Sequence, residues 1–251
     1  MAGGGGNPLA DPVAEGRRIA EAAAGRDVPV RMLGGVAIAM RCPSARRRPL
    51  QRAYGDLDLA APGRARKEAA ELLESLGYAG DREFNLLHGH RRLLFWDRRN
   101  ERQLDVFVEE ANLCHRIELR RRLELVPLTL SLADLAVLKL QVVETSEKDY
   151  LDLCALFADH EPTGDESGVN VAYIAALAAS DWGLWKTLGT VAERCERFAL
   201  GLEGFEAGEV VAERLRQLRR ELDRVPKTRG WKLRSRLGER KRWYELPEEI
   251  H

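Results

Sequence analysis

A change of pattern at Pro127 constrains the fold of this 251-residue chain more than any other feature. Before Pro127, short apolar segments alternate with helical ones and are separated by glycine, proline and polar turns. After it, apolar residues recur at helical spacing almost to residue 222. This order predicts an α+β or α/β class, with a mixed sheet and flanking helices over residues 1–127 and an all-helical domain over residues 128–251.

The pattern of apolar and polar residues in the first half of the chain predicts alternating helices and strands. A polar turn between two apolar segments predicts a hairpin of strands 91–97 and 102–109, and one or two further strands are expected within 117–130. Residues 42–53, which contain two prolines and a run of arginines, predict a loop. The remaining elements are a helix over 12–25, a strand over 28–33, a helix directly after Gly34-Gly35, a strand over 54–60 and a helix over 64–76.

The second half predicts helices over 131–143 and 147–159, separated by a linker at 161–168 from a helical region over 169–222. Ser131 is the expected N-cap of the first helix, with an acidic residue three positions later. Breaks in the last region are expected near Asp181 and residues 201–208.

The composition excludes several classes of protein. With 45% apolar and 32% charged residues, and with 40 basic against 40 acidic side chains, the chain is neither disordered nor attracted as a whole to nucleic acid. No apolar stretch reaches the length of about 18 residues that a membrane span needs, and the N-terminus lacks the features of a signal peptide. We therefore expect a soluble, cytoplasmic protein with no membrane partner.

Cysteine and histidine give little support for a metal or disulfide scaffold. The four cysteines lie far apart without a CxxC pair, which argues against a disulfide framework and a structural zinc site. His88 and His90 have no third ligand nearby in the sequence, so they are weak zinc candidates. They are expected at a loop or strand end instead.

Asp56 and Asp58 occupy alternate positions of the segment 54–60. On a strand they project from the same face, with Cα atoms about 6.5–7 Å apart. Carboxylates this close repel each other unless a cation lies between them, and a hydrated Mg²⁺ that also takes phosphate oxygens is a suitable one. The alternative is a solvated strand face.

Two further features carry chemistry. Gly34-Gly35 stands between an apolar strand and a helix, where the backbone can approach a ligand and the helix N-terminus favours anions. The alternative is an ordinary turn. Asp105 lies inside an apolar strand, where an unpaired charge is costly. It either joins the other two carboxylates in a metal cluster or pairs with an arginine such as Arg92 or Arg102.

Together, these features resemble the nucleotidyltransferase superfamily with the polymerase-beta-like fold. That family combines a Gly-Gly or Gly-Ser turn opening a helix, an Asp-x-Asp strand and a third carboxylate on a later strand. The resemblance implies that Asp56, Asp58 and Asp105 are catalytic and bind Mg²⁺ or Mn²⁺. It also implies that Gly34 and Gly35 cradle phosphate, and that the chain moves an NMP group from an NTP to an acceptor hydroxyl.

Beyond Pro127, the sequence looks like the Lys helix and the Lys-Asp-x-x-Asp helix of the AbiEii-type toxin branch. By this resemblance Lys139 is catalytic and contacts nucleotide phosphate, and Lys148 and Asp149 join the nucleotide site, with Asp152 one turn on. A lysine on an otherwise apolar helix face is costly to bury without an anionic partner. A surface ion-pair set formed by Lys148, Asp149 and Asp152 is the alternative.

The toxin branch implies that tRNA or a protein is the acceptor and that a cognate antitoxin is a partner. A second hypothesis keeps the chemistry but gives it a small-molecule acceptor, an aminoglycoside or a lincosamide. Residues 127–223, with nine basic and 18 acidic side chains, suit a cationic one. A third hypothesis is a degenerate member that binds nucleotide or RNA without catalysis, because Val36 stands where the family often has Ser or Thr.

Two basic segments are candidates for contact with NTP or tRNA. One is the cluster of Arg46, Arg47, Arg48 and Arg52, which otherwise belongs to a solvated loop. The other is the tail over residues 224–242, with nine basic side chains against one acidic, followed by Trp243 and Tyr244. Basic residues with aromatic ones suit single-stranded nucleic acid, but docking onto the acidic helical segment of the same chain is favoured because it needs no partner.

Overall fold

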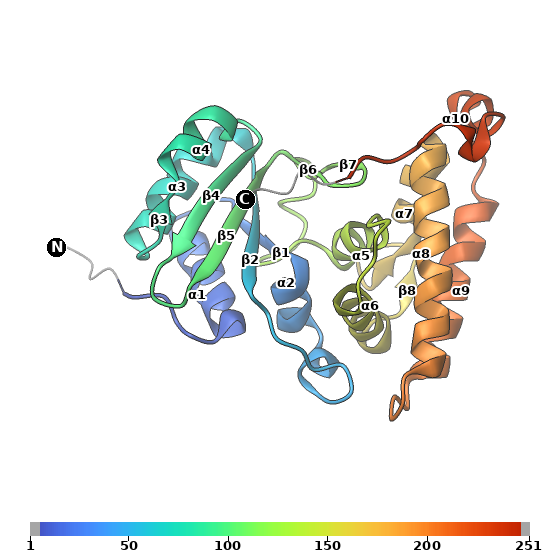
Figure 1. Cartoon of the computed structure of the whole chain (residues 1–251), viewed down its shortest axis with the longest axis horizontal. Coiled ribbons are helices and arrows are strands. Elements are labelled where there is room, and N and C mark those ends of the chain that lie inside the picture. Colours follow the sequence, from blue (N-terminus) through green and yellow to red (C-terminus); the bar gives the residue numbers. More distant parts are fainter. Residues whose placement is uncertain (1–5, 247–251) are drawn as a thin grey trace. The chain divides into compact units, whose positions relative to one another are not determined.

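The computed structural model describes residues 6–246, which fold into two compact units (Figure 1). The first unit comprises residues 6–40, 53–111 and 117–130 of the described chain, and the second comprises residues 41–52, 112–116 and 131–246. The units separate near residue 130, but two earlier segments pack with the helical unit. The functional boundary at 127/128 stays a prediction.

The first unit is built on a five-stranded mixed sheet, which confirms the fold class. Strands β2 and β5 are parallel, and every other pair is antiparallel. The order across the sheet is β1 (Arg31–Leu33), β2 (Asp56–Ala61), β5 (Arg102–Val108), β4 (Arg92–Asp97) and β3 (Ala79–Gly80). The predicted hairpin is the pair β4 and β5.

The helices of this unit begin where the sequence supplies caps and turns. The Asp11 carboxylate accepts a hydrogen bond from the Val13 N–H at 2.8 Å and caps the first helix. The helices are α1 (Pro12–Ala24), α2 (Gly34–Arg41), α3 (Arg66–Ser75) and α4 (Arg82–His88), with a 3-10 turn at Gly63–Ala65. Another 3-10 turn, Pro43–Arg46, lies in a segment that belongs to the helical unit. The expected loop at 42–53 therefore contains one such turn.

Helix α4 was not expected from the sequence. Its two leucines, Leu86 and Leu87, are exposed, so the segment lacks the apolar face that identifies an amphipathic helix. His88 lies in its last turn, and its ring is 4.9 Å from that of Phe84. The placement of His88 in a loop or at a strand end is therefore wrong, whereas His90 lies in the turn that follows.

The second unit is helical, as predicted. The Ser131 hydroxyl caps α5 by accepting from the Asp134 N–H at 3.3 Å, and Asp181 caps α8 and separates it from α7. The helices are α5 (Leu132–Leu140), α6 (Glu147–Asp159), α7 (Val171–Ser180), α8 (Trp182–Gly201), α9 (Gly208–Arg224) and α10 (Arg229–Ser235). The remaining elements of residues 6–246 are the short strands β6 (Glu110–Asn112), β7 (Arg116–Glu118), β8 (Pro162–Thr163) and β9 (Val169–Asn170) and a 3-10 turn at Gly238–Arg240.

Two expectations for the irregular segments hold only in part. The strands expected within 117–130 reduce to the end of β7 and an isolated parallel bridge of Thr129 to Met32. The expected linker 161–168 contains β8, which pairs in parallel with β9. All four cysteines are free and buried. Across residues 6–246, none of the helices combines the length and apolar character that crossing a bilayer requires.

Candidate functional site

The three carboxylates predicted to form the site, Asp56, Asp58 and Asp105, lie on neighbouring strands at one end of the sheet. Strand β1 runs antiparallel to β2, and β2 runs parallel to β5, so the end of β1 meets the beginnings of β2 and β5 (Figure 1). Asp58 is the register partner of Leu33 on one side and of Asp105 on the other, while Asp56 is opposite Gln103. Because register partners and alternate residues share a face, both aspartates of β2 and Asp105 project from the same face.

The three carboxylates differ in their exposure to solvent. Asp56, at the first position of β2, is exposed, and Asp58 is half-buried. Asp105 is only 3% exposed. The acidic face therefore runs from solvent into the edge of the core, where a carboxylate needs partners.

Asp105 has both of its oxygens occupied. Its Oδ1 accepts a hydrogen bond from Arg92 Nε at 2.8 Å, and its Oδ2 accepts one from Gln103 Nε2 at 2.7 Å. The sequence alternative of an arginine partner thus holds for Arg92, whereas Arg102 pairs with Asp97 at 2.8 Å. Gln103 was missed by sequence reasoning, although its position two residues before Asp105 places it on the same face.

The glycine turn lies directly against Asp58. Gly34 has a φ of +69°, and a Cβ atom at this position would lie 2.3 Å from Asp58 Oδ2. Gly35 follows in the first turn of α2. The chain therefore needs glycine at position 34 both for the backbone conformation and for the close approach of the carboxylate. This contact joins two features that lie more than twenty residues apart in the sequence.

A Gly34→Ala substitution should lower the free energy of unfolding by about 1–3 kcal/mol, because it combines a strained φ with a clash against Asp58. Urea denaturation measures this. Gly55→Ala is the matched control, since a Cβ atom at Gly55 meets nothing within 4 Å. We expect the control to stay within about 0.5 kcal/mol of wild type. Equal stabilities for the two variants would contradict the close contact.

The side chains of the site are of the type that binds a divalent cation, but they are not arranged as a set of metal ligands. Carboxylate oxygens such as those of Asp56 and Asp58 are the ligands that Mg²⁺ and Mn²⁺ prefer. Within residues 6–246, no group of three or more His, Cys, Asp or Glu side chains is arranged to hold a metal ion. Each oxygen of Asp105 accepts one hydrogen bond and keeps a second lone pair that could ligate a metal ion. Metal binding by the three aspartates stays a prediction.

Val36, the residue after the glycine pair, lies in the core. Val36 is 2% exposed, and a Cβ atom added to Gly16 of α1 would lie 2.7 Å from Val36 Cγ1. The side chain after the glycine pair therefore packs against α1 in the core. A hydroxyl there would be buried in an apolar contact, so valine serves packing at this position.

Lys139, which the sequence predicts to contact nucleotide phosphate, lies in the helical unit and takes part in a network of ion pairs. Lys139 Nζ lies 2.8 Å from Asp149 Oδ1 and 2.8 Å from Asp152 Oδ2. Arg52 binds the other side of Asp152 with two hydrogen bonds of 2.8 and 2.7 Å. Burial lowers the pKa of Lys139, but Asp152 and Asp149 outweigh it, so that the pKa is raised and the lysine stays charged.

The remaining residues of this predicted nucleotide site have different surroundings. Asp149 Oδ2 accepts hydrogen bonds from the Ser146 N–H at 3.1 Å and from the Ser146 hydroxyl at 2.8 Å. The bond from the Ser146 N–H belongs to the capping box of α6. Burial raises the pKa of Asp149, but Lys139 and these hydrogen bonds lower it below its usual value. Lys148 is exposed. Contact of Lys139, Lys148 and Asp149 with nucleotide stays a prediction.

The two basic segments have different surroundings in the structure. Arg46, Arg47 and Arg48 are exposed, whereas Arg52 is committed to Asp152. In the tail, the Trp231 ring lies 5.3 Å from that of Trp185, and the Trp243 ring lies 5.9 Å from that of Trp182. These contacts confirm that the tail aromatics pack on the helical unit of the same chain.

Comparisons with known proteins give limited likenesses. No family model matches the chain, and no curated protein matches it. Among solved structures, the crystal structure of ANT(2'')-Ia in complex with adenylyl-2''-tobramycin has a TM-score of 0.33 and 21% identity over 51% of this chain and 74% of that one. The solution structure of the antibiotic-resistance factor ANT(2'')-Ia has a TM-score of 0.34 and 18% identity over 84% of this chain and 94% of that one.

Proposed function

We propose that this chain is a metal-dependent nucleotidyltransferase, which moves an NMP group from an NTP to an acceptor hydroxyl and releases pyrophosphate. The observation that supports the proposal is the position of Asp58. It lies opposite Asp105 across two parallel strands, and its Oδ2 lies against the backbone of Gly34 at the beginning of α2. Carboxylates and an anion-favouring helix N-terminus at one place suit a cation and a phosphate together.

Each residue then has a defined task. Asp56 and Asp58 hold Mg²⁺ or Mn²⁺, which would neutralise charge on the NTP phosphates when bound. Asp105 completes the acidic face and accepts the proton of the acceptor hydroxyl, while Arg92 and Gln103 orient it. Gly34 and Gly35 allow phosphate to approach the backbone.

Residues of the helical unit supply positive charge. In this proposal Lys139 stabilises charge that develops on the phosphates, and Lys148 and Asp149 contact the nucleotide. The raised pKa of Lys139 keeps it cationic at neutral pH, which this task requires. Its two carboxylate partners also hold the ammonium group in one position.

The acceptor that we favour is a small cationic molecule with hydroxyl groups, of the aminoglycoside class. Residues 127–223 carry a net charge of −9, which attracts a polycation. The second candidate is the toxin reading, in which the acceptor is tRNA or a protein and an antitoxin controls the activity. The exposed Arg46, Arg47 and Arg48 favour RNA among these acceptors.

Expression in a drug-sensitive bacterium separates the two acceptor classes. We expect wild type to raise the minimal inhibitory concentration of at least one aminoglycoside by about tenfold, without arresting growth, and Asp58→Asn to give no protection. Growth arrest by wild type but not by Asp58→Asn would favour the toxin reading instead. If the variant and wild type behave alike in both respects, the proposed site is wrong.

A further inference from the structure

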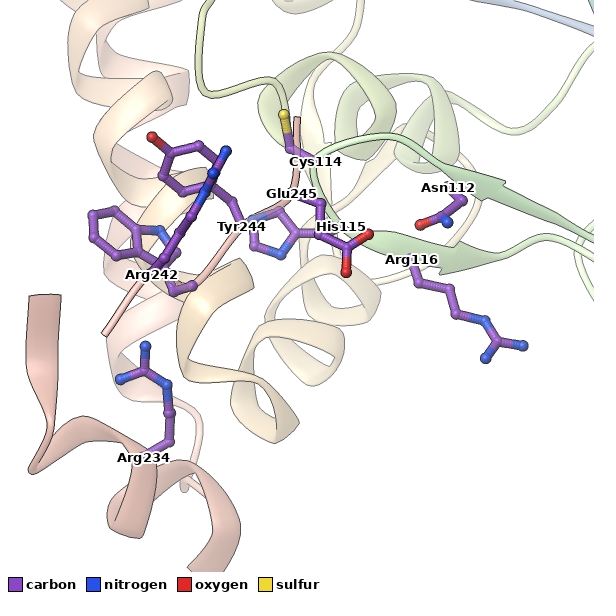
Figure 2. Close-up of a pocket in the computed structure, with 9 residues that line it drawn as sticks. Asn112, Cys114, His115, Arg116, Arg234, Arg242, Tyr244 and Glu245 are labelled. Atoms are coloured by element: carbon purple, nitrogen blue, oxygen red, sulfur yellow. The ribbon is translucent and has the colours of Figure 1, made fainter. Parts of the chain in front are cut away.

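A pocket in the helical unit lies outside the carboxylate site and uses none of its residues. It has a volume of about 580 Å³ and forms between the segment 112–116 and residues 234–245, which include the end of the basic tail and are called the tail below (Figure 2). Its lining combines three arginines with aromatic and polar side chains. The lining residues are Asn112, Cys114, His115, Arg116, Arg234, Arg242, Trp243, Tyr244 and Glu245.

The two walls of this pocket are joined by hydrogen bonds. The Glu245 N–H donates to the Cys114 carbonyl at 3.1 Å, so the tail is tied to the segment 112–116. Trp243 Nε1 donates to the Thr187 hydroxyl oxygen at 3.1 Å, and this oxygen lies 2.9 Å from His115 Nε2. The Thr187 hydroxyl therefore connects both walls of the pocket.

The lining is positively charged. Arg116, Arg234 and Arg242 stand against one carboxylate, Glu245, among the described lining residues. Burial lowers the pKa of His115, so the imidazole is neutral at neutral pH and adds no charge. In Figure 2 Arg234 and Arg242 lie on one side of Glu245 and Arg116 lies on the other, with its guanidinium pointing away from them. Both walls of the pocket therefore carry arginine side chains.

Two of the arginines are held in place by the tail itself. Arg234 donates to the carbonyls of Gly238 and Lys241 at 2.8 and 2.6 Å, and its guanidinium lies 4.7 Å from the Trp182 ring. The Arg242 guanidinium lies 4.9 Å from the centre of the Tyr244 ring. Ordering an arginine costs side-chain entropy, so these contacts reduce the cost of binding an anion.

We propose that this pocket binds a phosphate-bearing small molecule of nucleotide size. Guanidinium groups bind phosphate oxygens through paired hydrogen bonds, which favours phosphate over other anions. The volume falls within the range of about 300–1,000 Å³ that is typical of small-molecule sites. The Tyr244 and Trp243 side chains supply aromatic surface for a planar ring, and Asn112 adds amide donors and an acceptor.

Calorimetric titration with AMP in the presence of EDTA tests the proposal after removal of the metal ion that the carboxylate site would use to bind phosphate. We expect the full chain to bind AMP, and to bind adenosine at least about tenfold more weakly because adenosine lacks the phosphate. Arg242→Gln and Arg116→Gln, on opposite walls, should each weaken AMP binding by about tenfold or more.

The matched control is Arg236→Gln, which removes an exposed charge from the same tail without changing the lining. It should leave AMP affinity within about twofold of wild type. Absence of AMP binding at millimolar concentration would overturn the proposal, as would equal affinity for adenosine or equal losses in Arg236→Gln and Arg242→Gln. Because EDTA removes divalent metal, any of these results leaves the nucleotidyltransferase proposal standing.

Discussion

An Asp58→Asn substitution should lower the rate of nucleotidyl transfer by about a thousandfold and leave the fold intact. The amide keeps the shape of the carboxylate against Gly34 but loses the charge that a divalent cation needs. Pyrophosphate release at saturating NTP measures the rate. Asp58 is half-buried rather than enclosed, so the loss of charge should change the free energy of unfolding by less than about 1 kcal/mol.

Glu71→Gln is the control for this prediction. Glu71 lies on α3 in the same unit and makes an exposed ion pair with Lys67 at 3.7 Å. Removing its charge should leave both the rate and the stability unchanged within experimental scatter, because an exposed pair of this kind contributes about 0–1 kcal/mol. If Asp58→Asn retained wild-type activity, the assignment of the acidic face as the catalytic centre would be wrong.

A Lys139→Met substitution should destabilise the chain by about 3 kcal/mol or more. It leaves Asp149 without its ammonium partner, and it leaves Asp152, which is 1% exposed, with the Arg52 guanidinium but without the ammonium group. Breaking a buried pair from one side costs more than the pair contributes, because the remaining charge stays desolvated. Equilibrium unfolding in urea measures the change.

Lys148→Met provides the comparison, since Lys148 is the neighbouring basic residue of the same predicted motif and is exposed. We expect it to change stability by less than about 0.5 kcal/mol. Should Lys139→Met keep the stability of wild type, the ion-pair network would not be a structural one. A loss of transfer activity in that stable variant would then assign Lys139 to phosphate directly.

Elements with strong local patterns were predictable from the sequence. The helix from Pro12 follows an aspartate cap, and the hairpin of β4 and β5 has a polar turn between two apolar strands. The second helix of the helical unit was predicted over 147–159 and is observed at Glu147–Asp159, where a capping box begins it. Helix α4 has no such pattern, since its leucines are exposed and its cap, Asp81, stands in a polar context.

The residues that make up the candidate site could be predicted from the sequence, but the strand register and the ion-pair partners could not. Alternation on a strand placed Asp56 and Asp58 on one face, because it depends only on local geometry. The register that puts Asp58 beside Asp105 depends on how β2 and β5 pair, and no local feature encodes that register. The same holds for Arg52, whose partner Asp152 lies one hundred residues away.

The measurement that tests the central claim most directly is transfer of label from each α-labelled NTP in the presence of Mg²⁺, with an aminoglycoside mixture and with total tRNA as separate acceptors. The account predicts label on an acceptor with wild type, dependence on Mg²⁺ or Mn²⁺, and no label with Asp58→Asn. Failure of wild type to bind any NTP in the presence of Mg²⁺ would contradict the assignment of Asp56, Asp58 and Asp105.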